Sequence, residues 1–381
     1  MASRQVITGI EALRAQKFAP LRGKRVGLLT NPSAVDRLLN STLDILRSAD
    51  EVQLVALFSP EHGIAAAVAD GEPVASGRDP RTGLTLHSLY GETTRPTPDM
   101  LRGLDVIVCD IQDIGVRYYT FTWTITHVLE AAGEAGIEVM ILDRPNPLGG
   151  KVAGAPLEPA LTSLVGRVPV PTQPGMTLGE LARLFNATWN PTPAALSVIA
   201  CEGYRRGMMW AEIGLPFVPP SPNMPHLVTA QHYPGACLVE GTTLSEGRGT
   251  ALPFEIFGAP GLNGHALAEA LNKQDWDGVR FRPHYFQPAA NKHAGVMCGG
   301  VQAHITDAAA YRPLRVWLGV LAAILSLYTF EWNAGHFDRL IGVHGVRERI
   351  DAGEALDDLF AQWEQFCRDF AVMRTPYLLY E

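Results

Sequence analysis

The stretch LDVIVCDIQDIGVRYY, residues 104–119, carries the clearest fold signal in the sequence. Its first half is a short apolar run ending in Asp110, as a buried parallel strand does at the edge of its sheet. Its second half puts polar and aromatic side chains on the loop that follows, and ligands of open α/β sheets bind at that edge. A strand end capped by polar residues would look similar. We nevertheless expect site residues here, namely Asp110, Gln112, Asp113, Arg117 and Tyr118.

The same pattern occurs at two other strand ends. The run VQLVALF at 52–58 leads into Ser-Pro-Glu61-His62-Gly, and EVMILD at 138–143 leads into Arg144-Pro-Asn146. With a further strand at 24–30, these runs alternate with helical segments over about 150 residues, which predicts a Rossmann-like, doubly wound parallel sheet. Parallel strands end at one edge, and carboxylates buried there have raised pKa values, as a general acid needs. We therefore expect convergence of Glu61, His62, Asp110, Asp143, Arg144 and Asn146.

The amino-acid composition of the sequence changes near Gly150. From there to about Pro260 it is rich in Pro and Gly, with one clear helix at 176–189 that Thr177 caps. Strands are expected at 279–283 and 300–306, and helices at 261–273, 314–329, 337–350 and 355–373. These features predict two domains, a Rossmann-like domain at 1–150 and an α+β domain at 151–381.

Composition excludes several classes of protein. The formal net charge is −8 with interspersed signs, so a nucleic-acid partner is not expected. The first residues contain no apolar h-region, and the most apolar run, 316–327, is too short to span a bilayer. The five cysteines form no C-x-x-C pair, which fits reduced, buried thiols. We expect a cytoplasmic protein that does not bind membranes.

Motifs of several enzyme classes are missing. The first strand ends in Asn31-Pro-Ser33 and not in a G-x-G-x-x-G turn, so a dinucleotide fingerprint is absent where it would stand. The histidines have no H-E-x-x-H spacing, and there is no G-x-S-x-G elbow. We therefore predict no metal and no cofactor.

A second candidate region lies in the later half of the chain. Residues 240–250, EGTTLSEGRGT, combine glycines with Glu240, Glu246 and Arg248. A phosphate loop would carry a lysine followed by a helix, so this composition better fits hydrogen bonds to sugar hydroxyls or an arginine-clamped carboxylate. A turn with a structural salt bridge would also fit. The rigid segment PPSPNMP at 219–225, with the amide of Asn223, is a candidate wall of the site.

Six ordered motifs together closely resemble the exo-β-N-acetylmuramidase (NamZ-type) family. They are GKRVGLLTNP at 23–32, LFSPEHGI at 57–64, DIQDIGVRYYT at 110–120, LDRPNPLGG at 142–150, PPSPNMP at 219–225 and LSEGRGT at 244–250. The resemblance implies a Rossmann-like N-terminal domain without nucleotide and a C-terminal domain with barrel-like β structure. It also implies a cleft that removes N-acetylmuramic acid (MurNAc) from non-reducing ends of peptidoglycan fragments, with Glu61 as the catalytic glutamate.

The hypothesis is therefore hydrolysis of a β-glycosidic bond with Glu61 as general acid. For a second catalytic carboxylate we rank Glu246 first, then Asp110, then Asp113. Alternatively, the 2-acetamido group of the sugar is itself the nucleophile, with Asp110 or Asp113 orienting it. Arg117, Arg144 and Arg248 are candidates to hold the lactyl carboxylate of MurNAc, because arginine binds carboxylates in a bidentate manner. The remaining expected substrate contacts are His62, Gln112, Arg117, Tyr118, Asp143, Arg144, Asn146, Asn223, Glu240 and Arg248. The rival hypotheses are a non-catalytic amino-sugar-binding protein and a Rossmann-type transferase.

Overall fold

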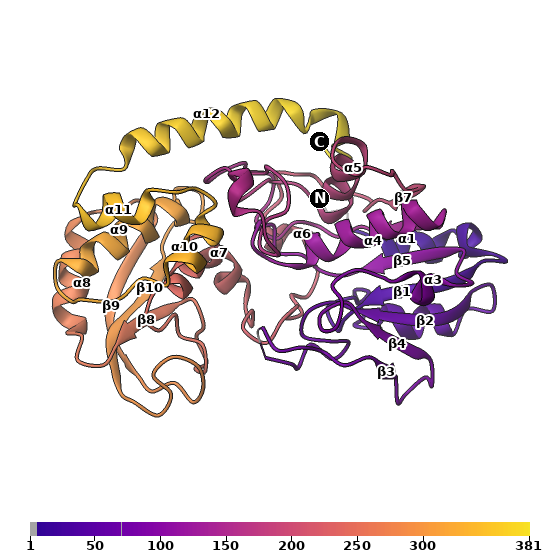
Figure 1. The fold of residues 1–381 in the computed structure, drawn as a ribbon, viewed down its shortest axis with the longest axis horizontal. Coiled ribbons are helices and arrows are strands. Elements are labelled where there is room, and N and C mark those ends of the chain that lie inside the picture. Colours follow the sequence, from indigo (N-terminus) through magenta and orange to yellow (C-terminus); the bar gives the residue numbers. More distant parts are fainter. Residues whose placement is uncertain (1–5, 70) are drawn as a thin grey trace.

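The computed structural model describes residues 6–69 and 71–381 and contains two separate sheets (Figure 1). The larger sheet has seven strands in the order β3-β4-β2-β1-β5-β6-β7. All neighbours are parallel except β3 and β4, which are antiparallel. Its strands are β1 (Arg25–Thr30), β2 (Gln53–Ser59), β3 (Gly77–Arg78), β4 (Thr85–Ser88), β5 (Val106–Asp110), β6 (Glu138–Leu142) and β7 (Leu196–Ile199).

Helices cover both faces of this sheet, and the alternation of side chains along β5 shows why. Val106 and Val108 pack on one face with α1 (Gly9–Ala15) and α2 (Thr42–Arg47). Ile107 and Cys109 pack on the other face with α3 (Pro98–Leu101), α4 (Phe121–Ala135) and α5 (Leu178–Thr188). A strand buried on both faces must be apolar throughout. The predicted doubly wound α/β domain is therefore confirmed.

Without the short β3, the strand order is that of a dinucleotide-binding fold. The point at which the order of the strands reverses lies between the parallel strands β1 and β5. The crevice at this reversal, where nucleotides bind in such folds, is filled by the chain itself. Arg144 pairs with Asp110, and Asn31 donates a hydrogen bond to the carbonyl of Pro220 at 3.1 Å. The hollow that remains measures about 10 Å³, which is about the room that one water molecule needs.

The C-terminal part is α+β. Its sheet has three antiparallel strands in the order β8-β10-β9, and helices pack against it. Among the described residues this sheet is open, in place of the barrel-like arrangement that the resemblance implies. Its elements are α6 (Trp210–Ile213), α7 (Leu227–Ala236), β8 (Ile256–Ala259), α8 (Gly264–Lys273), β9 (Val279–Phe286), β10 (Cys298–Ile305), α9 (Pro313–Leu325), α10 (Ala334–Ile341), α11 (Val346–Asp351) and α12 (Asp357–Met373).

Three features differ from the sequence-based expectation. The first sheet continues past residue 150, because β7 pairs with β6; β7 is short and only half-buried, which hid it among prolines. The helix expected at 337–350 is two helices, since Gly342 and Gly345 adopt φ of 83° and 82°. A Cβ at Gly342 would also lie 2.4 Å from Nη2 of Arg117. Finally, α7 forms in the Pro-rich region and contains Pro234.

The last helix joins the two parts of the molecule. Figure 1 shows α12 running from beside α9 and α11 toward α5 and the C-terminus. Trp363 of α12 packs in the main core, and Phe370 packs against Leu181 and Leu184 of α5. The five cysteines are free and buried, as expected. In the described part of the chain, no helix is long and apolar enough to cross a membrane.

Candidate active site

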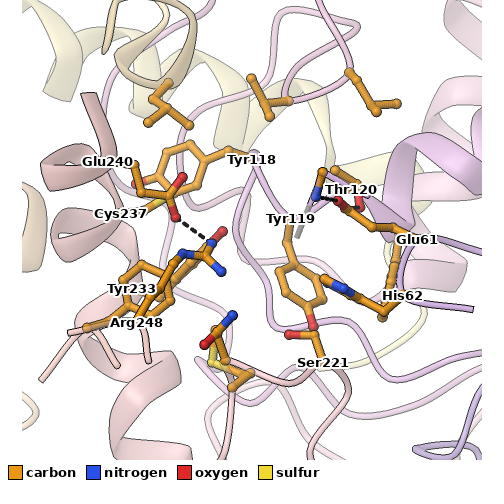
Figure 2. A pocket seen from close by; sticks show the side chains of 18 of the residues that line it. Glu61, His62, Tyr118, Tyr119, Thr120, Ser221, Tyr233, Cys237, Glu240 and Arg248 are labelled. Carbon is orange, nitrogen blue, oxygen red and sulfur yellow. Dashed lines mark hydrogen bonds and ion pairs between the residues drawn. The ribbon is translucent and has the colours of Figure 1, made fainter. Parts of the chain in front are cut away.

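A cavity of about 260 Å³ lies between the two parts of the molecule (Figure 2). One wall comes from the loops after β2 and β5, and the other from the end of α7, the segment 237–254 and α10. Of the residues expected from the sequence, the cavity brings together Glu61, His62, Tyr118, Asn223, Glu240 and Arg248.

Glu61 stands two residues beyond the end of β2 and is 6% exposed. Its Oε2 accepts a hydrogen bond from Oγ1 of Thr120 at 2.6 Å, and its Oε1 accepts one from the backbone N–H of Gly71 at 3.3 Å. Both oxygens are thus oriented by donors on other loops. The carboxyl group is therefore held in one place at the cavity wall.

His62 has a left-handed backbone, with φ of 68°, and Gly63 follows with φ of 77°. Such a conformation costs about 1 kcal/mol or more for a residue with a Cβ and occurs preferentially at functional sites. Nδ1 of His62 lies 2.9 Å from the carbonyl oxygen of Val68, so that nitrogen carries the proton and donates. In the neutral ring, Nε2 is then a hydrogen-bond acceptor.

The opposite wall carries an ionised carboxylate. Oε1 of Glu240 lies 2.7 Å from Nη2 of Arg248, and its Oε2 lies 3.4 Å from Nε2 of His336. Burial by itself would raise the pKa of Glu240, but the charge of Arg248 and the hydrogen bond from His336 outweigh it and lower this pKa to about 2. Glu240 is therefore an anion at neutral pH. Figure 2 shows it and Arg248 across the cavity from Glu61.

Glu246 lies behind this wall and does not line the cavity. It pairs with Lys292 at 2.9 Å and with Nε of Arg248 at 3.4 Å. The ammonium of Lys292 also donates to the carbonyls of Val239, Glu240 and Leu244. These contacts fix the glycine-rich loop, and Glu246 supports Arg248. A second catalytic group would face the cavity, and Glu246 does not.

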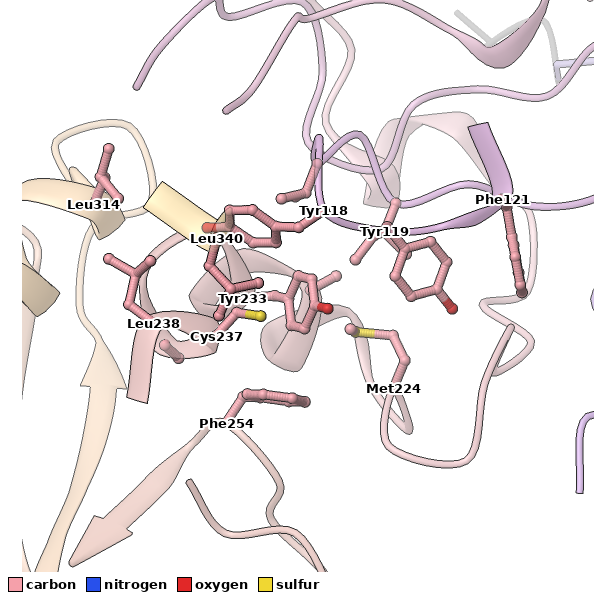
Figure 3. Packing of buried hydrophobic residues seen from close by; sticks show 14 of the residues in the cluster. Tyr118, Tyr119, Phe121, Met224, Tyr233, Cys237, Leu238, Phe254, Leu314 and Leu340 are labelled. Atoms are coloured by element: carbon pink, nitrogen blue, oxygen red, sulfur yellow. The ribbon is translucent and has the colours of Figure 1, made fainter. Parts of the chain in front are cut away.

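Aromatic rings form the floor of the cavity (Figure 3). Tyr233 of α7 makes ring contacts with Tyr118 at 5.6 Å, Tyr119 at 6.0 Å and Phe254 at 4.8 Å between centroids. The hydroxyl of Tyr118 donates to the carbonyl of Pro234, and Arg248 lies 5.0 Å above the ring of Phe254. Tyr118 thus contributes to the cavity mainly through its ring.

The expected convergence of strand ends is only partly found. Glu61 and His62 reach the cavity, but Asp110 and Arg144 do not line it. Asp110 is 1% exposed and is neutralised by Arg144, whose Nη2 donates to it at 3.0 Å. Because β1 and β5 separate β2 from β6 in the sheet, these strand ends are about 5 to 15 Å apart. Asp110 and Arg144 therefore close the crevice beside the cavity.

Asp113, Gln112 and Asn146 also have partners within the fold and do not line the cavity. Asp113 accepts hydrogen bonds from the N–H of Gly115 at 2.6 Å and from Thr122, and burial raises its pKa to about 6. Gln112 donates to two backbone carbonyls at 2.7 and 3.0 Å. Asn146 donates to one carbonyl at 3.0 Å and accepts from one N–H at 2.9 Å. These three residues shape loops.

Arg117 and Asp143 serve as buried connectors. Arg117 is 2% exposed, burial lowers its pKa to about 10, and it donates to five carbonyls. Burial raises the pKa of Asp143 to about 6, although it accepts from Tyr380, Thr177 and the N–H of Gly179. Neither residue lines the cavity. The carbonyls bonded to Arg117 belong to Ala155, Pro156, Val170, Leu340 and Ile341.

Sequence reasoning missed several lining residues. Thr120 directly follows the Tyr118-Tyr119 pair, and its position at the start of α4 was the available signal. Tyr233 and His336 lie on α7 and α10, and nothing in their local sequence marks them. Among residues 6–69 and 71–381, no three His, Cys, Asp or Glu side chains are grouped so as to hold a metal ion.

Comparisons with known proteins all point to one family. Residues 26–228 match the family model "Exo-beta-N-acetylmuramidase NamZ, N-terminal", and residues 231–380 match the corresponding C-terminal model. The chain is 42% identical to the peptidoglycan beta-N-acetylmuramidase NamZ of Bacillus subtilis (strain 168) over 380 residues, 99% of this chain and 92% of that protein.

Two crystal structures of DUF1343-family proteins from Bacteroides fragilis NCTC 9343 have the same fold. The first has a TM-score of 0.92 at 37% identity, and the second has a TM-score of 0.79 at 30% identity. Each alignment covers 99% of this chain and 99% of the other. The arrangement of both domains is thus shared along the whole chain.

Proposed function

This chain belongs to the exo-β-N-acetylmuramidase family, and we propose that it removes MurNAc from the non-reducing ends of peptidoglycan fragments. It is a glycosidase. The observation that supports this activity best is the presence of two carboxyl groups on opposite walls of the cavity. Glu61 is held by Thr120 on one wall, and Glu240 is held as an anion by Arg248 on the other. Glycosidases commonly use two carboxyl groups in different roles, one to protonate the leaving oxygen and one to assist the attack on C1.

We assign the role of general acid to Glu61. Its proton passes to the glycosidic oxygen as the bond from that oxygen to C1 of the sugar breaks. Glu240 cannot take this role at neutral pH, because its pKa is about 2. In the second step, the carboxylate of Glu61 accepts a proton from the water that attacks C1.

For the first attack on C1, the geometry favours the 2-acetamido group of the substrate. The oxygens of Glu240 are engaged by Arg248 and His336, which reduces their nucleophilicity. The acetamido carbonyl oxygen then forms the bond to C1 while the glycosidic bond breaks, and water later opens the resulting ring. Glu240 orients the acetamido N–H and stabilises the positive charge that develops on it. This assignment replaces Glu246, Asp110 and Asp113 as candidates for the second group.

The lactyl carboxylate of MurNAc needs a positive partner. Of the three arginines expected to supply one, Arg117 and Arg144 do not line the cavity, whereas Arg248 lines it beside its partner Glu240. Arg248, His62 and the amide of Asn223 are therefore the proposed contacts for the lactyl and acetamido groups. The aromatic floor of Tyr118 and Tyr233 supplies the apolar face for the sugar ring. The cytoplasmic location remains a prediction.

The test is release of 4-nitrophenol from 4-nitrophenyl β-N-acetylmuraminide and from the matching β-N-acetylglucosaminide. Wild type should cleave the muraminide and not the glucosaminide, Glu61→Gln should lose at least a thousandfold in kcat, and Glu51→Gln, at an exposed turn, should match wild type. Binding of MurNAc by Glu61→Gln should persist. Full activity of Glu61→Gln would contradict the assignment, and lack of turnover by wild type with retained binding would favour a non-catalytic sugar-binding protein.

A further inference from the structure

A second cavity, larger than the candidate active site, lies beneath α12. It measures about 650 Å³, within the range of sites for small molecules. Three segments form its walls: residues 151–154 with Gln173, the first turn of α9, and one face of α12. The residues of α12 recur at the spacing of a helix face, from Phe360 and Trp363 to Cys367 and Ala371. The cavity therefore lies where α12 passes from one part of the molecule to the other.

The lining is strongly cationic. It contains five basic side chains and one carboxylate, that of Glu364. Within the part of the chain that the structure describes, one of the five, Arg315, has a carboxylate partner, Asp357, in an exposed pair. The other four basic side chains are Lys151, Arg312, Arg368 and Arg374.

Two of these four are held in place by neutral groups. Arg312 donates to the carbonyls of residues 309, 310 and 311, and Arg374 donates to those of residues 150, 174 and 175. Carbonyls fix a guanidinium without neutralising its charge. Arg374 is 7% exposed, and its Nε has no hydrogen-bond partner. The guanidinium groups of Arg312 and Arg374 are therefore held in place without an ion pair to a described carboxylate.

Lys151 is the member of the group without a polar partner among the described residues. Its ammonium makes no hydrogen bond or ion pair with any described residue, and solvent reaches it inside the hollow. The surrounding protein and the nearby charge of Arg312 lower its pKa to about 8. An anion between Lys151 and Arg312 would relieve this repulsion.

The remaining lining is apolar and aromatic. The rings of Phe360 and Trp363 are 5.5 Å apart, and the guanidinium of Arg315 lies 4.8 Å above Phe360. Leu314 and Val152 complete this side. A cavity with a charged end and an aromatic side fits a ligand with the same two parts.

We propose that this cavity is a second binding site, which takes a small organic anion with its charged group between Lys151 and Arg312 and its apolar body against Phe360 and Trp363. A carboxylate and a phosphate monoester share this chemistry. The site is separate from the proposed hydrolysis, since none of its lining residues lines the candidate active site.

The test is titration of the full-length protein with 8-anilinonaphthalene-1-sulfonate, an aromatic anion, followed by calorimetry and fluorescence. Wild type should bind one equivalent, and affinity should fall with added salt. Lys151→Gln should weaken binding at least fivefold, and Lys151→Gln with Arg312→Gln at least twentyfold. Arg22→Gln removes an exposed charge elsewhere and should bind as wild type does. Glu61→Gln should also bind normally, which separates this site from the candidate active site.

Lys151→Gln keeps the test decisive if the double variant does not fold, because the ammonium of Lys151 makes no hydrogen bond or ion pair with a described residue. Competition with 1-naphthylacetate and 1-naphthyl phosphate identifies which anion the site prefers. Absence of probe binding, equal binding by wild type and Lys151→Gln, failure of both competitors, or an equal loss in Arg22→Gln would overturn the proposal.

Discussion

Thr120 donates a hydrogen bond from Oγ1 to Oε2 of Glu61 at 2.6 Å. The two residues come from different strand ends, since Glu61 follows β2 and Thr120 precedes α4. The contact gives one oxygen of the carboxyl group a fixed direction. Preorganised hydrogen bonds of this kind are a main source of catalytic power.

Thr120→Val should therefore lower kcat about ten- to a hundredfold with little change in KM, because Glu61 becomes a carboxylate as it gives up its proton, and a hydrogen bond to a charged group contributes about 1.5–3 kcal/mol. Thr120→Ser, which keeps the hydroxyl, should restore most of the rate. Steady-state kinetics on the chromogenic muraminide measures both. Thr124→Val, one turn along α4, removes a hydroxyl that donates to the backbone of Thr120, and it should retain kcat within about twofold. An equal loss in both variants would indicate a purely structural effect.

A substrate analogue tests the role of the acetamido group. Replacing the N-acetyl group of the chromogenic muraminide by N-trifluoroacetyl withdraws electrons from the carbonyl oxygen that we propose as nucleophile. We expect kcat to fall at least tenfold, because that oxygen forms the bond to C1 in the first step. If an enzyme carboxylate were the nucleophile, the rate would change little. The comparison uses initial rates of 4-nitrophenol release at saturating substrate.

Arg248→Gln should destabilise the fold in a pH-dependent manner. Glu240 has a folded pKa of about 2, below its ordinary value, so its stabilising contribution is present above about pH 4.5 and is lost as the pH falls toward 2. Removing Arg248 should lower the free energy of unfolding by about 3 kcal/mol at pH 7 and by much less at pH 3. Urea unfolding at both pH values measures this. Arg280→Gln, which breaks an exposed pair with Asp275, should change stability by less than about 0.5 kcal/mol at either pH.

Tyr380→Phe should destabilise the protein through Asp143. The hydroxyl donates to Oδ2 of Asp143 at 2.6 Å and accepts from the N–H of Cys201 at 2.9 Å, so two buried groups lose a partner. We expect a cost of about 2–3 kcal/mol at pH 7. Burial raises the pKa of Asp143 to about 6, above its unfolded value, so this carboxyl destabilises the fold as the pH rises from about 4 through 6.

The cost of Tyr380→Phe should accordingly be larger at pH 7, where Asp143 is ionised and needs the donor, than at pH 5. Chemical unfolding at these two pH values checks the difference. Tyr377→Phe is the matched control, since its partly exposed hydroxyl makes one long contact of 3.4 Å with Thr188. A deficit in Tyr380→Phe that does not depend on pH would contradict the role given to Asp143.

The fold was predictable because strand signals and burial agree along the first half of the chain. In β5, an apolar side chain at each position from Val106 to Cys109 fits a strand buried on both faces, and the structure shows that arrangement. The chain after residue 150 was less predictable, since the half-buried β7 of the first sheet and the Pro-containing α7 have weak periodic patterns. Glycines at positive φ divided one expected helix into two.

The site was predictable only where its residues lie in motifs. Glu61, Glu240 and Arg248 stand out in the sequence because they are charged residues in short glycine- or proline-containing motifs. Asp110 and Arg144 stand out for the same reason, yet they neutralise each other. Sequence does not distinguish a carboxylate that faces a cavity from one that faces an arginine. Tyr233 and His336 reach the site only through the packing of α7 and α10 against the first domain.

The contacts of Arg117 show how a substitution outside the cavity would affect activity. Its guanidinium binds carbonyls at 155–156 and 170, and also those of Leu340 and Ile341 at the end of α10. Leu340 and His336 of the same helix line the cavity, so this one side chain ties the loop after β5 to the helix that forms part of the opposite wall. Substitutions at this joint would therefore lower turnover by misaligning the two walls of the cavity, although Arg117 itself does not line it.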